Sequence, residues 1–151
     1  MARLIALLAV LSALMLGPSA PVAYAATAEY NLTHGLALSG YDPVAYFTEG
    51  RPVKGNAAHV FSYGPATYHF ASEKNRATFA ANPARYAPKY GGYCAYGMAR
   101  GYKAPIDPAA FTIVRGSLYM NYSQSVQRTW RKDIHGYVER ADHNWPSVKS
   151  E

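Results

Sequence analysis

The sequence has little cysteine and few acidic residues. Cys94 is the single cysteine among 151 residues, so the chain cannot close an internal disulfide or give two thiolates to one metal ion. Half of the residues are hydrophobic and 16% are charged, which excludes a disordered chain, and the length excludes a large multidomain enzyme. The sequence contains no P-loop, no G-x-S-x-G and no G-x-G-x-x-G motif. We therefore favour a non-enzymatic function.

The long apolar run of the chain lies at its N-terminus. Arg3 is followed by an apolar segment from Leu4 to Leu16, and Ala23-Tyr24-Ala25 is the small-x-small pattern that signal peptidase accepts. This run is too short to span a bilayer, which needs about 20 apolar residues. We interpret residues 1–25 as a cleaved signal peptide, with a retained anchor as the alternative. The mature protein would then begin at Ala26 and be periplasmic or secreted.

The mature chain is basic. Removal of residues 1–25 leaves 14 Lys and Arg residues against nine Asp and Glu residues, a net charge of +5. Basic, tyrosine-rich segments can stack nucleic acid bases, but an exported protein seldom meets nucleic acid. We expect a small ligand, a metal ion or an envelope protein as the partner instead. No later segment has the length of a membrane-spanning helix.

Turn and cap residues predict a small α+β domain after the signal peptide. Residues 26–39 are interpreted as a partly strand-like N-terminal arm, and residues 40–151 as one domain with a C-terminal extension. Two β-hairpins are predicted, each followed by a helix with serine as its N-cap. The first hairpin pairs Val60–Tyr63 with Thr67–Ala71, and Ser72 then caps a helix that ends near Ala81. The second hairpin pairs Phe111–Val114 with Leu118–Tyr122, and Ser123 then caps the second helix.

The two hairpin-plus-helix segments match each other at an offset of 51 residues. Tyr68 and Ser72 fall on Tyr119 and Ser123 when the two segments are aligned. The match indicates two copies of one unit. The alternative is a coincidence of two common motifs, because few of the aligned residues are identical.

Apolar residues spaced three and four apart predict a C-terminal helical segment. The stripe runs from Val126 to Trp145, and a stripe of this kind usually faces the core. We expect the helix to end at Pro146, with a break near Gly136.

The segment from Lys89 to Lys103 is the unusual one. It holds four glycines, four tyrosines and the cysteine. No carboxylate lies between Glu73 and Asp107, whereas six basic residues do, so the field around Cys94 should be positive. A positive field favours the thiolate, the form that attacks electrophiles and binds soft metals. Tyr93, Cys94 and Tyr96 are therefore the candidate binding residues.

Copper is the metal that this residue set suits best. Cys94, Met98 and an imidazole from His69 or His59 would supply thiolate, thioether and nitrogen, which copper favours. The alternative is that Cys94 is a small buried apolar side chain. His69 alternates with Tyr68, which is expected to face the core, so it is equally interpreted as an exposed or satisfied histidine.

Two other functions remain open for the same segment. Cys94 could be the nucleophile of a thiol-dependent redox protein or enzyme, whose partner residues would meet it only in space. The protein could instead be an interaction module, with Tyr90, Tyr93, Tyr96 and Tyr102 as an exposed aromatic surface.

Three motifs resemble the YHS domain family, over about residues 40 to 98. The most specific is an asparagine-proline-x-x-tyrosine ending after a hairpin and a short helix. The continuation to Asn144-Trp145-Pro146 is similar to short exported bacterial YHS proteins. The motifs are Tyr41-Asp42-Pro43-Val44-Ala45-Tyr46-Phe47, Tyr68-His69-Phe70-Ala71-Ser72-Glu73 and Phe79-Ala80-Ala81-Asn82-Pro83-Ala84-Arg85-Tyr86.

The resemblance implies a fold like that of treble-clef zinc modules. Metal-binding members of the family, which accompany copper-transporting ATPases, carry cysteines at positions that correspond here to Ala45, Ala71 and Asn75. The usual metal ligands of the family are therefore absent, and Cys94 lies at none of these three positions.

Overall fold

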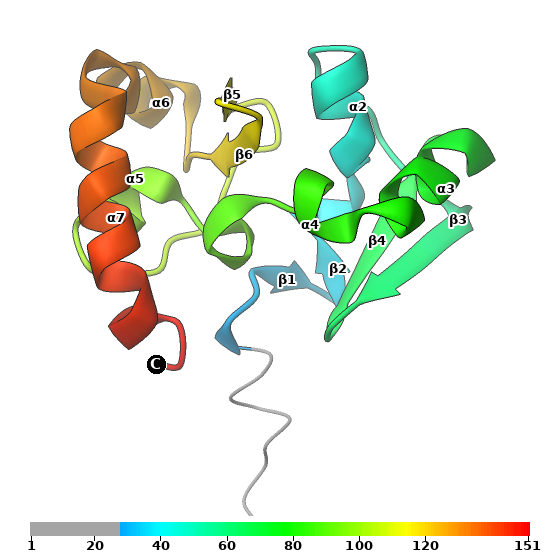
Figure 1. The fold of residues 1–151 in the computed structure, drawn as a ribbon, viewed down its shortest axis with the longest axis horizontal. Helices are drawn as coiled ribbons and strands as arrows, with labels where there is room; N and C mark the ends of the chain where they lie inside the picture. Colours follow the sequence, from blue (N-terminus) through cyan, green and yellow to red (C-terminus); the bar gives the residue numbers. More distant parts are fainter. Residues whose placement is uncertain (1–27) are drawn as a thin grey trace, which may run out of the picture.

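The N-terminal arm and the first hairpin form one mixed sheet in the computed structural model, which describes residues 28–151 (Figure 1). The predicted signal peptide lies outside these residues. The strand order is β1-β2-β4-β3, with β2 parallel to β4 and the other pairs antiparallel. The arm is thus partly strand, as predicted, and it is joined to the hairpin. The strands are β1 Leu32–Thr33, β2 Leu36–Ala37, β3 Asn56–Tyr63 and β4 Ala66–Phe70.

Short helices accompany this sheet. The 3₁₀ turn η1 (Leu38–Gly40) and α2 (Pro43–Thr48) lie between β2 and β3 in sequence, and α3 (Glu73–Ala81) and α4 (Pro83–Tyr86) follow β4. Asn82-Pro83 separates α3 from α4, as expected from the restriction that proline places on the residue before it.

The second half repeats the order of helix, hairpin and helix. The 3₁₀ turn η2 (Lys89–Gly92) leads into α5 (Ala95–Ala99), and β5 (Phe111–Val114) pairs antiparallel with β6 (Ser117–Met120). Then come α6 (Gln124–Trp130), the 3₁₀ turn η3 (Arg131–Asp133) and the long α7 (Ile134–Val148). The mixture of short strands and helices confirms the α+β class, whereas the treble-clef likeness stays a prediction. No helix in residues 28–151 is long and apolar enough to cross a membrane.

Serine caps the helix after each hairpin. Asn75 N donates to Ser72 Oγ at 3.1 Å, and Val126 N donates to Ser123 Oγ at 3.2 Å. Both helices therefore begin where the sequence predicted, because the hydroxyl satisfies an N–H that the first turn leaves unpaired.

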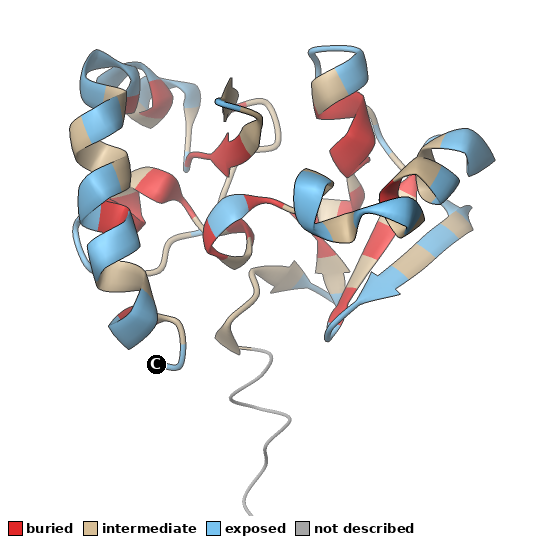
Figure 2. Cartoon of the chain, viewed as in Figure 1, coloured by how far each residue is buried: buried red, intermediate tan, exposed pale blue. Residues whose placement is uncertain are grey.

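Strand β6 divides the interior into two clusters. Successive side chains of a strand point to opposite faces, so Leu118 and Met120 join the core beneath β4 while Tyr119 joins the cluster beneath α7. The buried residues in Figure 2 follow the same division, with one group around α2 and β4 and another around α5. The segment around Cys94 lies where these two halves meet.

The predicted break in the C-terminal helical segment is confirmed to within three residues, whereas its predicted end was wrong. The chain turns at η3, three residues before Gly136, where Gly136 N donates to Asp133 Oδ1 at 3.0 Å and starts α7. Pro146 lies inside α7, and Lys149 N still donates to Trp145 O at 2.9 Å. Proline removes one backbone hydrogen bond in this last turn, and the burial of Val148 offsets that loss.

Glycine allows the N-terminal arm to lie against the Lys89–Lys103 segment. Gly91 has φ +58°, and a Cβ there would stand 1.7 Å from the carbonyl oxygen of Glu29. Asn31 N donates to Gly91 O at 2.9 Å, and the Tyr93 hydroxyl donates to the carbonyl oxygens of Ala28 and Tyr30 at 3.0 and 3.2 Å. Part of the glycine and tyrosine content of this segment is therefore structural.

Candidate functional site

Cys94 is the N-cap of α5, and its sulfur accepts three N–H groups. Gly97 N donates at 3.5 Å and Tyr122 N at 3.3 Å, while Asn121 Nδ2 lies 3.9 Å from Sγ. Gly97 belongs to the first turn of α5 itself, and Asn121 and Tyr122 follow β6 in the sequence. Each N–H presents its positive end to Sγ, so the sulfur is the hydrogen-bond acceptor that joins α5 to the residues after β6.

A small pocket opens beside this sulfur. Cys94 is only 1% exposed, yet it lines a cavity of about 220 Å³. The rim is aromatic and reachable, because Tyr102 and Tyr122 are 47% and 56% exposed. A ligand that enters past these rings would meet the thiol. The lining residues are Cys94, Tyr96, Tyr102, Ala104, Tyr122 and Val126.

Two cationic side chains of the Lys89–Lys103 segment lie on tyrosine rings of that segment. The Arg100 guanidinium carbon lies 5.7 Å from the ring centre of Tyr96, and Lys103 Nζ lies 5.5 Å from that of Tyr93. These cations stand on the faces of the two candidate tyrosines.

Asn121 is a fully buried amide with an unused acceptor next to this thiol. Its Nδ2 is directed at Cys94, whereas its Oδ1 has no hydrogen-bond partner within residues 28–151. A buried polar atom without a partner is rare and often marks a functional site. Sequence reasoning missed Asn121 and Tyr122, although both occupy the aligned end of the second hairpin.

The predicted metal ligands are distributed over the molecule. Met98 is buried in the cluster beneath α7, one turn beyond Cys94 on the same helix. His69 lies on β4 beside Gly40 and Gly55, on the face opposite the buried Tyr68. Neither Met98 nor His69 lines the Cys94 pocket. In the described part of the chain, no group of three His, Cys, Asp or Glu side chains is arranged to hold a metal ion.

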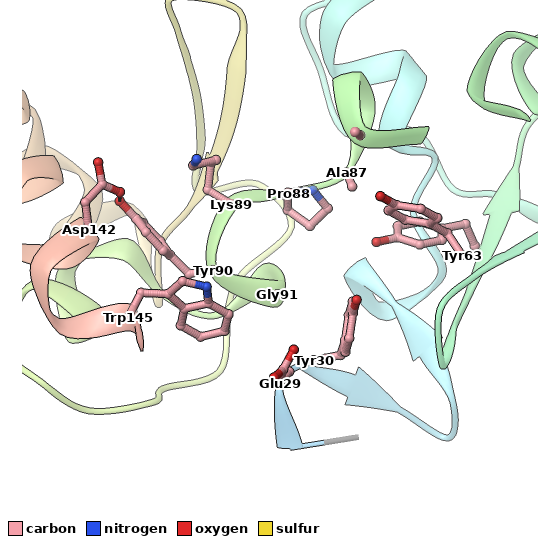
Figure 3. Close-up of a pocket in the computed structure, with 12 residues that line it drawn as sticks. Glu29, Tyr30, Tyr63, Ala87, Pro88, Lys89, Tyr90, Gly91, Asp142 and Trp145 are labelled. Carbon is pink, nitrogen blue, oxygen red and sulfur yellow. Dashed lines mark hydrogen bonds between the residues drawn. The ribbon is translucent and has the colours of Figure 1, made fainter. Parts of the chain in front are cut away.

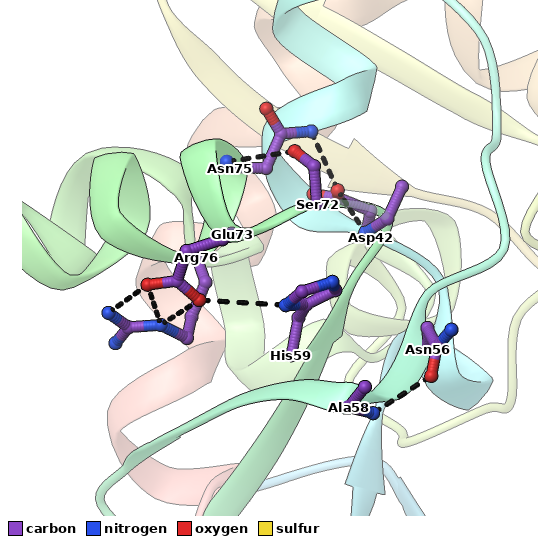
Figure 4. A network of polar contacts seen from close by, with 9 residues as sticks. Asp42, Asn56, Ala58, His59, Ser72, Glu73, Asn75 and Arg76 are labelled. Carbon is purple, nitrogen blue, oxygen red and sulfur yellow. Dashed lines mark hydrogen bonds and ion pairs between the residues drawn. The ribbon is translucent and has the colours of Figure 1, made fainter.

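His59, the other candidate imidazole, lies beside Glu73. Its Nδ1 is 3.5 Å from Glu73 Oε2, and Glu73 also pairs with Arg76 (Figure 4). The bond to Arg76 and, more weakly, the contact with His59 lower the pKa of Glu73.

The four tyrosines of the segment do not form one exposed surface. Tyr90 is 4% exposed and donates its hydroxyl to Asp142 Oδ1 at 2.8 Å, and burial and this bond raise its pKa. Tyr93 and Tyr96 are half-buried. The exposed aromatic pair at the site is Tyr102 with Tyr122, which comes from outside the segment.

A fully buried carboxylate, Asp42, occupies the centre of the first half. It caps α2 by accepting Val44 N at 2.8 Å and Ala45 N at 3.3 Å, and it also accepts Ala71 N at 2.8 Å and Asn75 Nδ2 at 2.7 Å (Figure 4). Ala45, Ala71 and Asn75 are the positions at which metal-binding YHS domains carry cysteine. They converge here on a carboxylate.

Cys94 in the second half corresponds to Asp42 in the first. Each caps a helix, and each uses its side chain to accept the N–H of the residue just before the serine that caps the next helix. Each also donates its own N–H to a carbonyl oxygen about ten residues ahead. The corresponding pairs are Asp42 and Cys94, Val53 and Ala104, Ala71 and Tyr122, Ser72 and Ser123. The predicted repeat thus includes the helix before each hairpin.

Comparison with known proteins supports the family that the motifs indicated. The family model of the YHS domain matches residues 44–90, which run from α2 to η2 and include the first of the two units. Residues 44–90 are therefore recognised as a YHS domain. No curated protein and no solved structure matches it. Cys94 and its pocket lie beyond the matched residues.

Proposed function

We propose that this protein is an exported binding protein of the cell envelope that holds its ligand in the Cys94 pocket. The observation that supports this proposal is the sulfur itself. It accepts three N–H groups, and Cys94 lines a cavity of about 220 Å³ with an aromatic rim. Sulfur is a soft ligand, so a soft cation is the complementary ligand.

Copper(I) is the first metal to consider. Thiolate and thioether are its preferred ligands, and Met98 offers the next sulfur along the chain, one turn further on α5. Neither Met98 nor His69 lines this pocket, but Met98 is one turn from Cys94 on α5 whereas His69 lies on β4, so we propose copper binding through the two sulfurs without His69.

The metal proposal is tested by titrating the reduced protein with copper(I) against a competing chelator. We expect Cys94→Ser to lose about a hundredfold in affinity and Met98→Leu about tenfold, while His69→Asn stays at the wild-type value. Serine keeps an N-cap oxygen, so Cys94→Ser should fold. Equal affinity in wild type and Cys94→Ser, or no saturation at micromolar copper, would refute copper binding.

Export is tested on the natural product. The intact mass of the protein from the periplasmic or culture fraction should correspond to a chain that begins at Ala26. A chain that keeps residues 1–25 and sediments with membranes would support the retained anchor instead.

A second candidate function is thiol chemistry at Cys94. The fully buried Asn121, with Oδ1 unpartnered within residues 28–151, favours it because an unused acceptor beside a thiol can hold a polar reactant. Alkylation by iodoacetamide at neutral pH should then be faster in the folded protein than in the unfolded chain. A slower rate in the folded protein would leave Cys94 without a nucleophilic role.

A further inference from the structure

An aromatic cavity lies away from Cys94, between the two halves. It has a volume of about 530 Å³ and shares no lining residue with the Cys94 pocket. Figure 3 shows its walls: the N-terminal arm with Glu29 and Tyr30, the tip of the first hairpin with Tyr63, the turn at Gly91, and α7 with Trp145. Four segments distant in sequence therefore meet around one space.

Three phenol groups gather on one side of this cavity. Tyr68 is 1% exposed and lines the cavity, and its hydroxyl makes no hydrogen bond to any residue from 28 to 151. Burial raises the pKa of Tyr68, and neighbouring Tyr30 and Tyr63 add to this shift. Burial, together with the charge of Glu29, also raises the pKa of Tyr30. The hydroxyls of Tyr30 and Tyr68 therefore stay neutral at physiological pH and can turn a lone pair toward a ligand.

The charged groups of the cavity are mostly acidic. Glu29 and Asp142 carry carboxylates, and Lys89 is the cation among the lining residues, with its nitrogen directed away from Glu29 in Figure 3. One oxygen of Asp142 accepts the Tyr90 hydroxyl, which leaves the other available. Glu29 meets Lys149 at 3.5 Å, but both side chains are more than a third exposed, so this pair is weak.

We propose that this cavity binds a small organic cation that carries a substituted ammonium group. Aromatic faces attract such a cation through their quadrupoles, and Tyr30, Tyr63 and Trp145 surround the space from different segments. The carboxylates of Glu29 and Asp142 neutralise the charge, and the hydroxyl of Tyr68 offers a polar contact. An anion would face two carboxylates here and is disfavoured.

The proposal is tested by calorimetric titration of the purified protein with choline. The matched control ligand is 3,3-dimethyl-1-butanol, which has the same shape with carbon in place of the charged nitrogen. We expect saturable binding of choline and at least tenfold weaker binding of the neutral alcohol. Equal affinities for the two ligands, or no saturation by choline at 10 mM (about −2.7 kcal/mol), would overturn the proposal.

Three variants test separately what the carboxylate charge, the aromatic face and the hydroxyl contribute to choline binding. Glu29→Gln and Trp145→Leu should each weaken choline binding about tenfold, and Tyr68→Phe about threefold. Lys149→Met frees Glu29 from its ion pair and should leave binding unchanged or tighten it. Unchanged binding in both Glu29→Gln and Trp145→Leu would show that choline binds elsewhere.

The two pockets are distinguished by Cys94→Ser. This variant should bind choline like the wild type, because the cavities share no residue. Loss of choline binding in a folded Cys94→Ser variant would contradict a separate site. Conversely, Trp145→Leu should have the same thiol reactivity at Cys94 as the wild type.

Discussion

Asp42 and Cys94 occupy the same place in the two units but differ in what surrounds them. Asp42 accepts four N–H groups and is completely buried, so its carboxylate serves the interior alone. Cys94 accepts three longer and weaker bonds, and it also lines a pocket with an exposed tyrosine rim. The first unit thus uses this position for stability, whereas in the second unit the same position lies beside a pocket.

The chemistry of the two acceptors explains the difference. A carboxylate in the interior must be saturated with hydrogen bonds, because a buried charge without partners is costly. Sulfur is a poor hydrogen-bond acceptor and tolerates fewer partners, so the structure around it can stay open. An amide stands beside each acceptor, Asn75 next to Asp42 and Asn121 next to Cys94.

Removal of the first acceptor should have the largest effect. Asp42→Ala leaves the N–H groups of Val44, Ala71 and Asn75 without their acceptor inside the core, so we expect a loss of about 4 kcal/mol in the free energy of unfolding. Urea denaturation followed by circular dichroism measures it. Asp42→Asn keeps one acceptor oxygen and should lose less; equal losses would mean that the carboxylate charge is the whole contribution.

Placing the acceptor of the first unit in the second, by Cys94→Asp, should have an intermediate effect on the free energy of unfolding. Cys94→Asp would receive N–H groups from Gly97, Tyr122 and Asn121, so we expect a folded protein that loses less than about 2 kcal/mol. Cys94→Ala, which removes the acceptor and leaves a small cavity, should lose about the same amount. The same denaturation measurement decides. If Cys94→Asp lost as much as Asp42→Ala, the two positions would not be equivalent.

Local features of the fold could be predicted from the sequence. Both hairpins and both serine caps depend on residues within a few positions of one another, and their turn and cap chemistry is visible in the chain. The helix through Pro146 was not predicted, because burial of Val148 by tertiary contacts overrides the local signal.

The sites depend on contacts that no local pattern contains. Sequence reasoning selected Cys94 from its rarity and its basic surroundings, and the structure places it at a pocket. Tyr122 and Asn121 could be assigned to that site only through the repeat, whose hydrogen-bond acceptors are different amino acids. The cavity between Tyr30 and Trp145 joins segments more than 100 residues apart, so no spacing in the sequence indicated it.

Replacement of the two serine caps should cause the smallest loss of stability, and nearly the same loss in the two units. Ser72→Ala and Ser123→Ala each remove one hydroxyl that accepts a backbone N–H at nearly the same distance, 3.1 and 3.2 Å. Each should therefore lose about 1 kcal/mol, and the double variant should lose the sum, because the two caps belong to different helices. Denaturation of the three variants measures this. A difference of more than about 1 kcal/mol between the single variants would show that the two units, although alike in hydrogen bonding, depend unequally on their second helix.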